Sequence, residues 1–174
     1  MVRTHRPSLK HGSATAYIGL GANLGDAQNT IDRALDALPH LGDTRLIARS
    51  SLYSSDPVGY LDQPPFINAV AAIETSLEPE TLLERLLSLE THFGRIRSFR
   101  NAPRALDLDL LLYGNALLSS PTLTLPHPRM HERAFVLIPL IEVCPDIVIP
   151  GQGAASALVA RCIAQCVARV ERSK

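Results

Sequence analysis

The sequence has 174 residues, which is enough for one domain with a hydrophobic core. Its 17 Lys and Arg balance its 17 Asp and Glu, so the chain carries no overall field that would attract nucleic acid or an anionic membrane. No apolar run approaches the roughly 20 residues of a membrane span. We therefore expect a globular protein that binds neither nucleic acid nor a membrane.

The N-terminus and the cysteines indicate where the protein works. Residues 1–14 are basic and polar without an apolar centre, so they predict a tail, ordered or not, ahead of a domain over 15–174 and no secretory signal. The cysteines are sparse and odd in number, as in a reducing compartment. They are Cys144, Cys162 and Cys166, and no His or Asp accompanies them at zinc-ligand spacing. We interpret them as structural or free thiols and expect a cytoplasmic protein.

The first elements predicted along the chain are a strand, a loop and a helix. Residues 15–20 have the composition of a short strand, and 21–26 form a loop bracketed by glycines. A helix capped by Asp26 or Asn29 follows and ends before Pro39. Its apolar residues recur at helical spacing: Ile31, Leu35 and Leu38.

Two further strands are predicted over 45–53 and 66–75. The connection between them, 54–65, is longer than a hairpin loop and rich in turn residues, which makes it a candidate for function.

A helix is predicted over 80–93 and a strand over 106–113, joined by an arginine-rich loop. The resulting order, β-α-β-β-α-β, suggests an α+β fold with a ferredoxin-like core in a single domain. The extra C-terminal elements include an apolar stretch over 135–141 and a final helix over 154–172.

Two aspartates give the strongest chemical signal. Asp107 and Asp109 are two apart on the predicted strand, so they share a face with Cα atoms about 7 Å apart. Neighbouring carboxylates repel, and Mg²⁺, which takes oxygen ligands and leaves room for phosphates, would relieve this. The alternative is a pair that is solvated or matched by arginines. The intervening leucines are expected to face the core: Leu108, Leu110 and Leu112.

Positive residues flank this strand. Arg95, Arg97, Arg100 and Arg104 precede it, and guanidinium groups suit phosphate, although an exposed basic loop is the alternative. His127 stands between two prolines, where it could donate to phosphate, act as an acid, or be a solvated loop histidine. A cation cluster beside a carboxylate pair is typical of polyphosphate transfer.

Five motifs together resemble the 6-hydroxymethyl-7,8-dihydropterin pyrophosphokinases, in that family's order and spacing over residues 16–150. They are Gly21-Ala22-Asn23-Leu24-Gly25; Asp62-Gln63-Pro64 with Phe66 and Asn68; Gly94-Arg95-Ile96-Arg97; Pro103-Arg104-Ala105-Leu106-Asp107-Leu108-Asp109; and Leu125-Pro126-His127-Pro128 with Arg133 and Phe135. The aspartate and histidine motifs are the most specific of the five.

The resemblance implies diphosphoryl transfer from ATP to the pterin hydroxymethyl group, with release of AMP, in folate synthesis. It implies two Mg²⁺ ions on Asp107 and Asp109 and catalytic roles for Arg95 and Arg104. It also implies a monomer with small-molecule substrates. The expected pterin-binding residues are Ser55, Pro57, Val58, Phe66, Asn68 and Phe135. The expected ATP-binding residues are Glu90, Arg97, Arg100, His127 and Arg133, of which Arg133 could contact either the phosphates or the pterin.

The sequence departs from the family at two places. Asn101-Ala102 stands where relatives often have Trp-Gly or a similar pair, and Leu87 and Thr122 stand where some relatives have Arg or Gln near ATP. The Asn101-Ala102 departure leaves open a degenerate member that binds pterin without turnover. A separate alternative is a non-catalytic ferredoxin-like module for RNA or a partner protein. The balanced charge argues against RNA.

Overall fold

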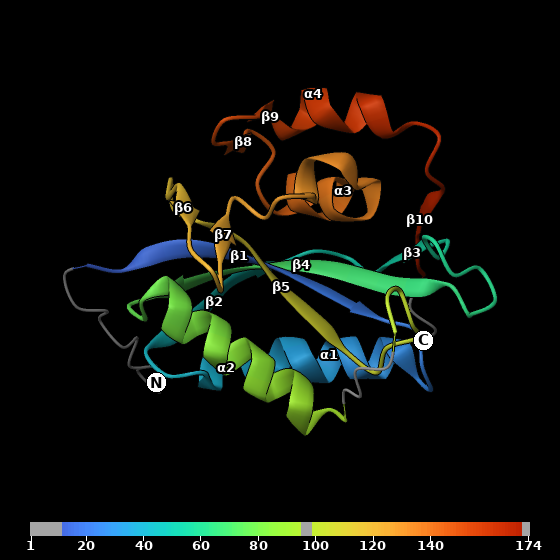
Figure 1. Cartoon of the computed structure of the whole chain (residues 1–174), viewed down its shortest axis with the longest axis horizontal. Helices are drawn as coiled ribbons and strands as arrows, with labels where there is room; N and C mark the ends of the chain where they lie inside the picture. Colours follow the sequence, from blue (N-terminus) through green and yellow to red (C-terminus); the bar gives the residue numbers. More distant parts are fainter. Residues whose placement is uncertain (1–11, 95–98, 172–174) are drawn as a thin grey trace, which may run out of the picture.

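The computed structural model describes residues 12–94 and 99–171, and an antiparallel sheet runs through its middle (Figure 1). Within these residues the sheet has six strands in the order β10-β3-β4-β1-β5, and β2 also pairs with β4. The strands are β1 (Ala14–Ala22), β2 (Thr44–Arg49), β3 (Tyr53–Ser55), β4 (Phe66–Thr75), β5 (Asp107–Tyr113) and β10 (Val167–Arg169). Helices and strands are therefore mixed in one domain, as the sequence predicted.

The strand expected over 45–53 is two strands. Residues 50–52 separate β2 from β3, and both strands pair with β4. The backbone of Ser50 donates to the Val70 carbonyl at 2.9 Å, while its Oγ accepts from the Val70 N–H, also at 2.9 Å. The side chain thus takes a ladder bond that backbone would otherwise make, which interrupts the strand.

Two helices cover one face of the sheet, α1 (Ala27–Ala37) and α2 (Pro79–His92). Asp26 caps α1 by accepting from the Asn29 N–H at 3.1 Å, as expected. Strand alternation sends every second residue toward these helices, where they form one buried core. Its members include Ile18, Leu20, Ile31, Leu35, Leu82, Leu86, Leu108 and Leu110.

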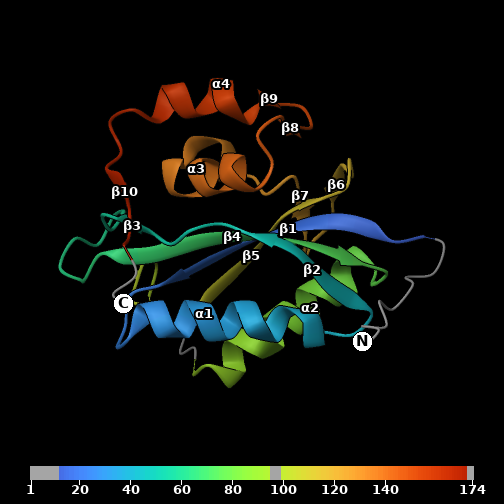
Figure 2. The same ribbon diagram turned by 180° about the vertical axis from the view of Figure 1, so that it is seen from behind.

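The opposite face carries α3 (Ala134–Val143) and α4 (Ala155–Val159), as Figure 2 shows from behind. A second core fills this layer and includes Val70, Leu111, Leu137, Leu140, Ile149 and Leu158. Leu112 also belongs here rather than with Leu108 and Leu110, because the register of β5 on β1 shifts between Tyr17 and Ile18. The irregularity turns the end of the strand toward α3.

Smaller elements complete the fold. Two short hairpins are formed by β6 (Leu118–Ser119) with β7 (Thr124–Leu125) and by β8 (Val148–Ile149) with β9 (Gly153–Ala154). Three 3₁₀ helices are η1 (Leu38–His40), η2 (Met130–Glu132) and η3 (Ala160–Cys162). In the described ranges, no helix combines the length and the apolar character that crossing a membrane requires.

The final helix predicted over 154–172 is wrong. α4 ends at Val159, a 3₁₀ turn follows, and β10 then pairs antiparallel with β3, Val167 opposite Ser55 and Arg169 opposite Tyr53. Pairing with an open sheet edge overrides the local helical preference of this segment. Of the predicted tail over 1–14, residues 1–11 lie outside the described residues.

Candidate active site

The floor of the site is a stretch of sheet with glycines in the central strand. Gly21 of β1 lies opposite Asn68 of β4 and Asp107 of β5, and Gly19 lies opposite Asp109. Residues directly opposite in an antiparallel sheet share a face. Because the glycines contribute no side chain, the floor stays open between the amide on β4 and the two carboxylates on β5.

A cavity of about 310 Å³ lies over this floor; we call it the sheet-face pocket. Its volume falls within the range typical of small-molecule sites. Phe66 at the start of β4 and Phe135 in the first turn of α3 both line it. The pocket therefore offers aromatic surface above an apolar and amide floor, which suits a flat heterocycle.

The orientation of Asn68 in this pocket is fixed by hydrogen bonds. Its side chain is 4% exposed, and Nδ2 donates to Ser55 Oγ at 2.8 Å and to the Tyr53 carbonyl at 3.3 Å. Oδ1 lies toward Gly21, where an added Cβ would be 3.4 Å away. The amide thus presents a defined acceptor at the floor of the pocket.

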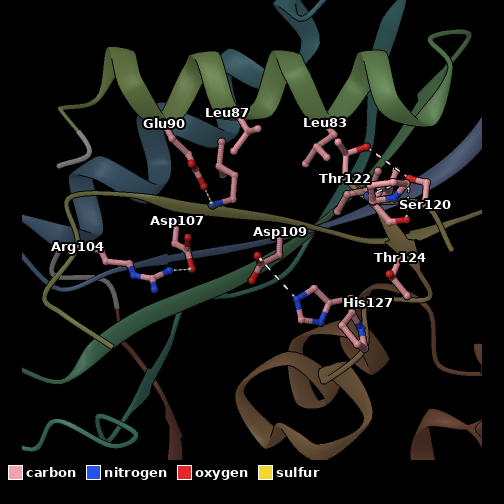
Figure 3. Close-up of a pocket in the computed structure, with 15 residues that line it drawn as sticks. Leu83, Leu87, Glu90, Arg104, Asp107, Asp109, Ser120, Thr122, Thr124 and His127 are labelled. Carbon is pink, nitrogen blue, oxygen red and sulfur yellow. Dashed lines mark hydrogen bonds and ion pairs between the residues drawn. The ribbon is translucent and has the colours of Figure 1, made fainter. Parts of the chain in front are cut away.

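A second cavity, of about 350 Å³, lies at the edge of the sheet beyond β5; we call it the sheet-edge pocket (Figure 3). Leu83 and Leu87 of α2 line one side, and Thr122 and His127 line the other. Glu90 also lines it but is only 1% exposed, and its Oε1 accepts from the Leu108 N–H at 2.7 Å. That bond fixes α2 to the strand between the two aspartates.

Three residues line both pockets: Arg104, Asp107 and Asp109. The Arg104 Nη1 lies 2.6 Å from the Asp107 Oδ2. Burial and the nearby charge of Asp107 raise the pKa of Asp109 to about 7, against the opposing influence of Arg133. The two cavities therefore meet at a pair of carboxylates, one of which is costly to ionise without a nearby positive charge.

The carboxylate pair fits a magnesium site. Among the described residues, no group of three or more His, Cys, Asp or Glu side chains could hold a metal ion by itself. Mg²⁺ needs no such cage, because it binds through one or two carboxylates and completes its coordination with water and substrate phosphates. Asp107 and Asp109 provide that donor set at the junction of two substrate-sized cavities.

His127 is a neutral donor that points toward this junction. Its Nδ1 accepts from the Arg129 N–H at 3.1 Å, which leaves the proton on Nε2, and Nε2 lies 3.9 Å from Asp109 Oδ1 (Figure 3). Burial, with the positive charge of Arg133, lowers the pKa of His127 to about 4. Near neutral pH the ring therefore offers an N–H without adding a charge.

Arg133 connects the aromatic wall with the carboxylates. Its guanidinium lies 5.6 Å from the centre of the Phe135 ring, within the range of a cation–π contact. Burial lowers the pKa of Arg133, and the charges of Asp109 and Asp107 oppose that shift. Arg133 remains a cation in the sheet-face pocket, beside the carboxylate pair.

The structure gathers most of the residues that the sequence selected. The sheet-face pocket contains Ser55, Val58, Phe66, Asn68, Arg133 and Phe135, and the sheet-edge pocket contains Glu90 and His127. Pro57 and the exposed Arg100 line neither of these two pockets. Arg95 and Arg97 lie outside the described residues.

Several lining residues were missed by the sequence analysis. Gly19 had a signal, because glycines two apart in a strand leave one face bare. Gln165 had none, since nothing local links it to a pocket formed more than 25 residues earlier in the chain. Asn101 was noted only as a departure from the family, yet it lines the sheet-face pocket.

Comparison with known proteins gives one consistent family. The family model described as 7,8-dihydro-6-hydroxymethylpterin-pyrophosphokinase matches residues 17–145. The 2-amino-4-hydroxy-6-hydroxymethyldihydropteridine pyrophosphokinase of Pseudomonas aeruginosa is 48% identical over 146 residues, covering 84% of this chain and 90% of that protein. The protein of the same name from Haemophilus influenzae is 46% identical over 145 residues, covering 83% and 91%.

Solved structures agree at the level of the fold. The Plasmodium falciparum HPPK-DHPS wild type with pterin and p-hydroxybenzoate aligns with a TM-score of 0.65 at 13% identity, covering 87% of this chain. The present chain spans 42% of that longer chain. An HPPK-DHPS in complex with substrates aligns with a TM-score of 0.69 at 12% identity, covering 86% of this chain and 43% of that one.

Proposed function

This chain belongs to the 7,8-dihydro-6-hydroxymethylpterin-pyrophosphokinase family, and from that premise we propose that it transfers diphosphate from ATP to the hydroxymethyl group of 6-hydroxymethyl-7,8-dihydropterin, with release of AMP, in folate biosynthesis. One observation carries the proposal. Two cavities of substrate size meet at Arg104, Asp107 and Asp109. A reaction that joins two bound molecules through phosphate requires this arrangement.

The pterin is assigned to the sheet-face pocket. Phe66 and Phe135 supply aromatic surface for a flat ring, and the fixed amide of Asn68 supplies an acceptor for its polar edge. Ser55 holds that amide, and the segment with Pro57 and Val58 is the proposed rim of the pocket.

ATP is assigned to the sheet-edge pocket, with its phosphates toward the carboxylates. The apolar side of this pocket, from Leu83 and Leu87, suits the base, and His127 lies at the phosphate end. Glu90 is proposed to act here by holding β5 in place, since its carboxylate is buried against the Leu108 N–H. Arg97 and Arg100 are proposed to reach the phosphates from the arginine-rich loop.

We propose that Asp107 and Asp109 hold two Mg²⁺ ions. When bound, Mg²⁺ neutralises the charge of the phosphate chain. Ionised carboxylates are required for this binding, and a bound cation would favour the ionised form of Asp109, whose pKa is raised by burial and by the charge of Asp107.

The chain's own residues position and stabilise the reacting groups. The pterin hydroxyl oxygen forms a bond to the β-phosphorus of ATP as the bond from that phosphorus to the α-phosphate bridging oxygen breaks, so AMP leaves with the electron pair. Arg104, Arg133 and the Nε2–H of His127 stabilise the charge that shifts between oxygens. Arg95 is proposed to join them. The hydroxyl proton leaves to Asp107, Asp109 or water.

We propose three further assignments beside the reaction: the topology of the core, the location of the protein and its oligomeric state. The strand order β5-β1-β4-β2 supports the ferredoxin-like interpretation of the core. The free cysteines Cys144, Cys162 and Cys166 support a cytoplasmic location, and we propose a monomer. A non-catalytic binding module is not favoured, because such a module has no need of two cavities that share a carboxylate pair.

AMP formation tests the proposal directly. Purified protein is incubated with ATP and Mg²⁺, with and without 6-hydroxymethyl-7,8-dihydropterin, and with EDTA as a further control. We expect AMP only when the pterin and Mg²⁺ are both present. A folded chain that binds the pterin but forms no AMP would instead be a degenerate member.

A further inference from the structure

Gln165 joins the C-terminal segment to the sheet-face pocket through two hydrogen bonds. Its Oε1 accepts from the Ala134 N–H at 2.9 Å, and its Nε2 donates to the Glu132 carbonyl at 2.7 Å. Gln165 also lines the sheet-face pocket and lies outside the 17–145 range of the family match. No role for it follows from the reaction as described above.

The two bonds lie on either side of Arg133. The Glu132 carbonyl belongs to the peptide before Arg133, and the Ala134 N–H belongs to the peptide after it. An amide side chain, with one acceptor and one donor, can satisfy both groups at once. Gln165 therefore restrains the backbone of Arg133 from both sides, and with it the direction in which the guanidinium leaves the chain.

The same bonds stabilise the start of α3. Arg133 is the N-cap residue of that helix, and its own side chain makes no capping bond. The first N–H groups of a helix need partners from outside the helix, and Gln165 supplies one for Ala134. Phe135 is the next residue, so the cap also fixes the aromatic wall of the pocket.

The backbone around Gln165 is fixed on both sides of this residue in the chain. Its backbone N–H donates to the carbonyl of Cys162 at 3.0 Å, and Cys162 is 6% exposed in the core under α3 and α4. Two residues later, Val167 pairs with Ser55 in β10 and β3. The C-terminal segment thus contacts both the Ser55 side and the Phe135 side of one pocket.

We propose that Gln165 is a positioning residue for the pterin: it orients Arg133 and Phe135 from the C-terminal segment. This inference rests on the proposed function. Neither Gln165 nor the two residues that it orients line the sheet-edge pocket, and the proposed role of Arg133 toward phosphate is in the transition state. Removal of Gln165 should therefore weaken pterin binding and leave the ground-state binding of the nucleotide unchanged.

The test compares three variants with the wild-type chain. Gln165→Met keeps the length of the side chain and removes both bonds. Gln165→Glu keeps an acceptor for the Ala134 N–H and loses the donor to the Glu132 carbonyl. Gln152→Met makes the same chemical change at an exposed glutamine that lines neither pocket. Each is assayed for pterin KM, for kcat, and for the Kd of a non-hydrolysable ATP analogue with Mg²⁺.

We expect Gln165→Met to raise the pterin KM about tenfold, as the loss of one partly buried and one exposed hydrogen bond would. The Kd of the ATP analogue should stay within about twofold, which a general loss of structure would not allow. Gln165→Glu should fall between wild type and Gln165→Met, and Gln152→Met should match wild type. If Gln165→Met does not fold, the pterin KM of Gln165→Glu, which retains the helix cap, tests the positioning role instead.

The outcomes separate this inference from the proposed function. Wild-type protein that forms no pterin-dependent AMP overturns the function itself. Active wild type with unchanged pterin KM in both Gln165 variants overturns the positioning role. Equal weakening of pterin and nucleotide also overturns it, because that result would mean that Gln165 supports only the fold.

Discussion

At the scale of single residues, Asp109 is difficult to ionise without a cation, and it is also a proposed ligand of magnesium. Replacing it with alanine should lower turnover by at least about 100-fold, since a charge-stabilising group of the reaction is lost. The chain should stay folded with an unchanged or higher melting temperature, because a partly buried carboxylate beside Asp107 is unfavourable in the metal-free protein. AMP assays and thermal unfolding in EDTA measure both effects.

A matched change at a different aspartate controls for this variant. Asp36 is exposed on α1, on the far side of the sheet from α3, and Asp36→Ala should leave the rate unchanged. Near-normal turnover of Asp109→Ala would contradict the assignment of this carboxylate to magnesium.

Gly21 is a residue whose function is to contribute no side chain. A Cβ added there would lie 3.4 Å from Asn68 Oδ1, on the floor of the sheet-face pocket. Gly21→Val should therefore weaken pterin binding by about tenfold or more, with a smaller effect for Gly21→Ala. Valine suits a strand, so the melting temperature should change little. Calorimetric titration with the pterin measures the loss, and wild-type affinity in Gly21→Val would show that the ring does not use this floor.

At the scale of elements, one carboxylate joins α3 to β3. Glu142 accepts from the Ser51 N–H at 3.0 Å, the Ser51 hydroxyl at 2.7 Å and the Tyr53 hydroxyl at 2.7 Å. Partial burial raises the pKa of Glu142, but the bonds from Tyr53 and Ser51 outweigh it and leave that pKa below its usual 4.5. A lowered folded-state pKa means stability that is present above pH 4.5 and lost as pH falls through the lower value.

Glu142→Gln should therefore destabilise the protein at pH 7 by about 1 kcal/mol, a figure reduced for the exposure of the carboxylate. The difference from wild type should shrink as the pH falls below 4.5, because stability from the ionised carboxylate is lost on approaching the lowered pKa of Glu142. Urea unfolding at pH 7 and pH 3.5 measures both values. An equal difference at the two pH values would show that the ionised form of Glu142 is not what stabilises the fold.

Elements with a strong local pattern were predictable from the sequence. The apolar spacing of α1 and α2 and the alternation that pairs Asp107 with Asp109 are encoded within a few residues. β10 was not predictable, because a short segment of mixed propensity became a strand only through pairing with β3. The position of Gln165 depends on that pairing, so it could not be predicted from the neighbouring residues in the sequence either.

The residues of the candidate site also differ in whether a local sequence pattern could predict them. The acidic pair emerged from strand alternation, whereas Phe66 and Phe135 were selected by family resemblance, since a phenylalanine in a strand or an apolar stretch is equally consistent with core packing. That both aromatic residues line one cavity with Asn68 is a property of the folded chain, in which β4 and α3 meet across about 70 residues of sequence.

At the scale of the whole molecule, the sheet separates two cavities and the carboxylate pair connects them. The sheet-face pocket, proposed for the pterin, lies on the face of the sheet and the sheet-edge pocket, proposed for the nucleotide, lies at its edge, and both reach Asp107 and Asp109 on β5. Ligands that bind only the folded state should therefore stabilise the protein separately, with only the nucleotide requiring the metal.

This arrangement predicts a pattern of thermal shifts. A ligand at about 100 times its Kd adds about 2.7 kcal/mol of stability, which for a domain of this size raises the melting temperature by roughly 5–10 °C. A non-hydrolysable ATP analogue should give this shift with Mg²⁺ and lose most of it in EDTA, whereas the pterin should shift the melting temperature in both conditions. Asp109→Asn should keep the pterin shift and lose the nucleotide shift. A pterin shift that disappears in EDTA, or a nucleotide shift that survives it, would mean that the metal does not belong to the shared carboxylate pair as assigned.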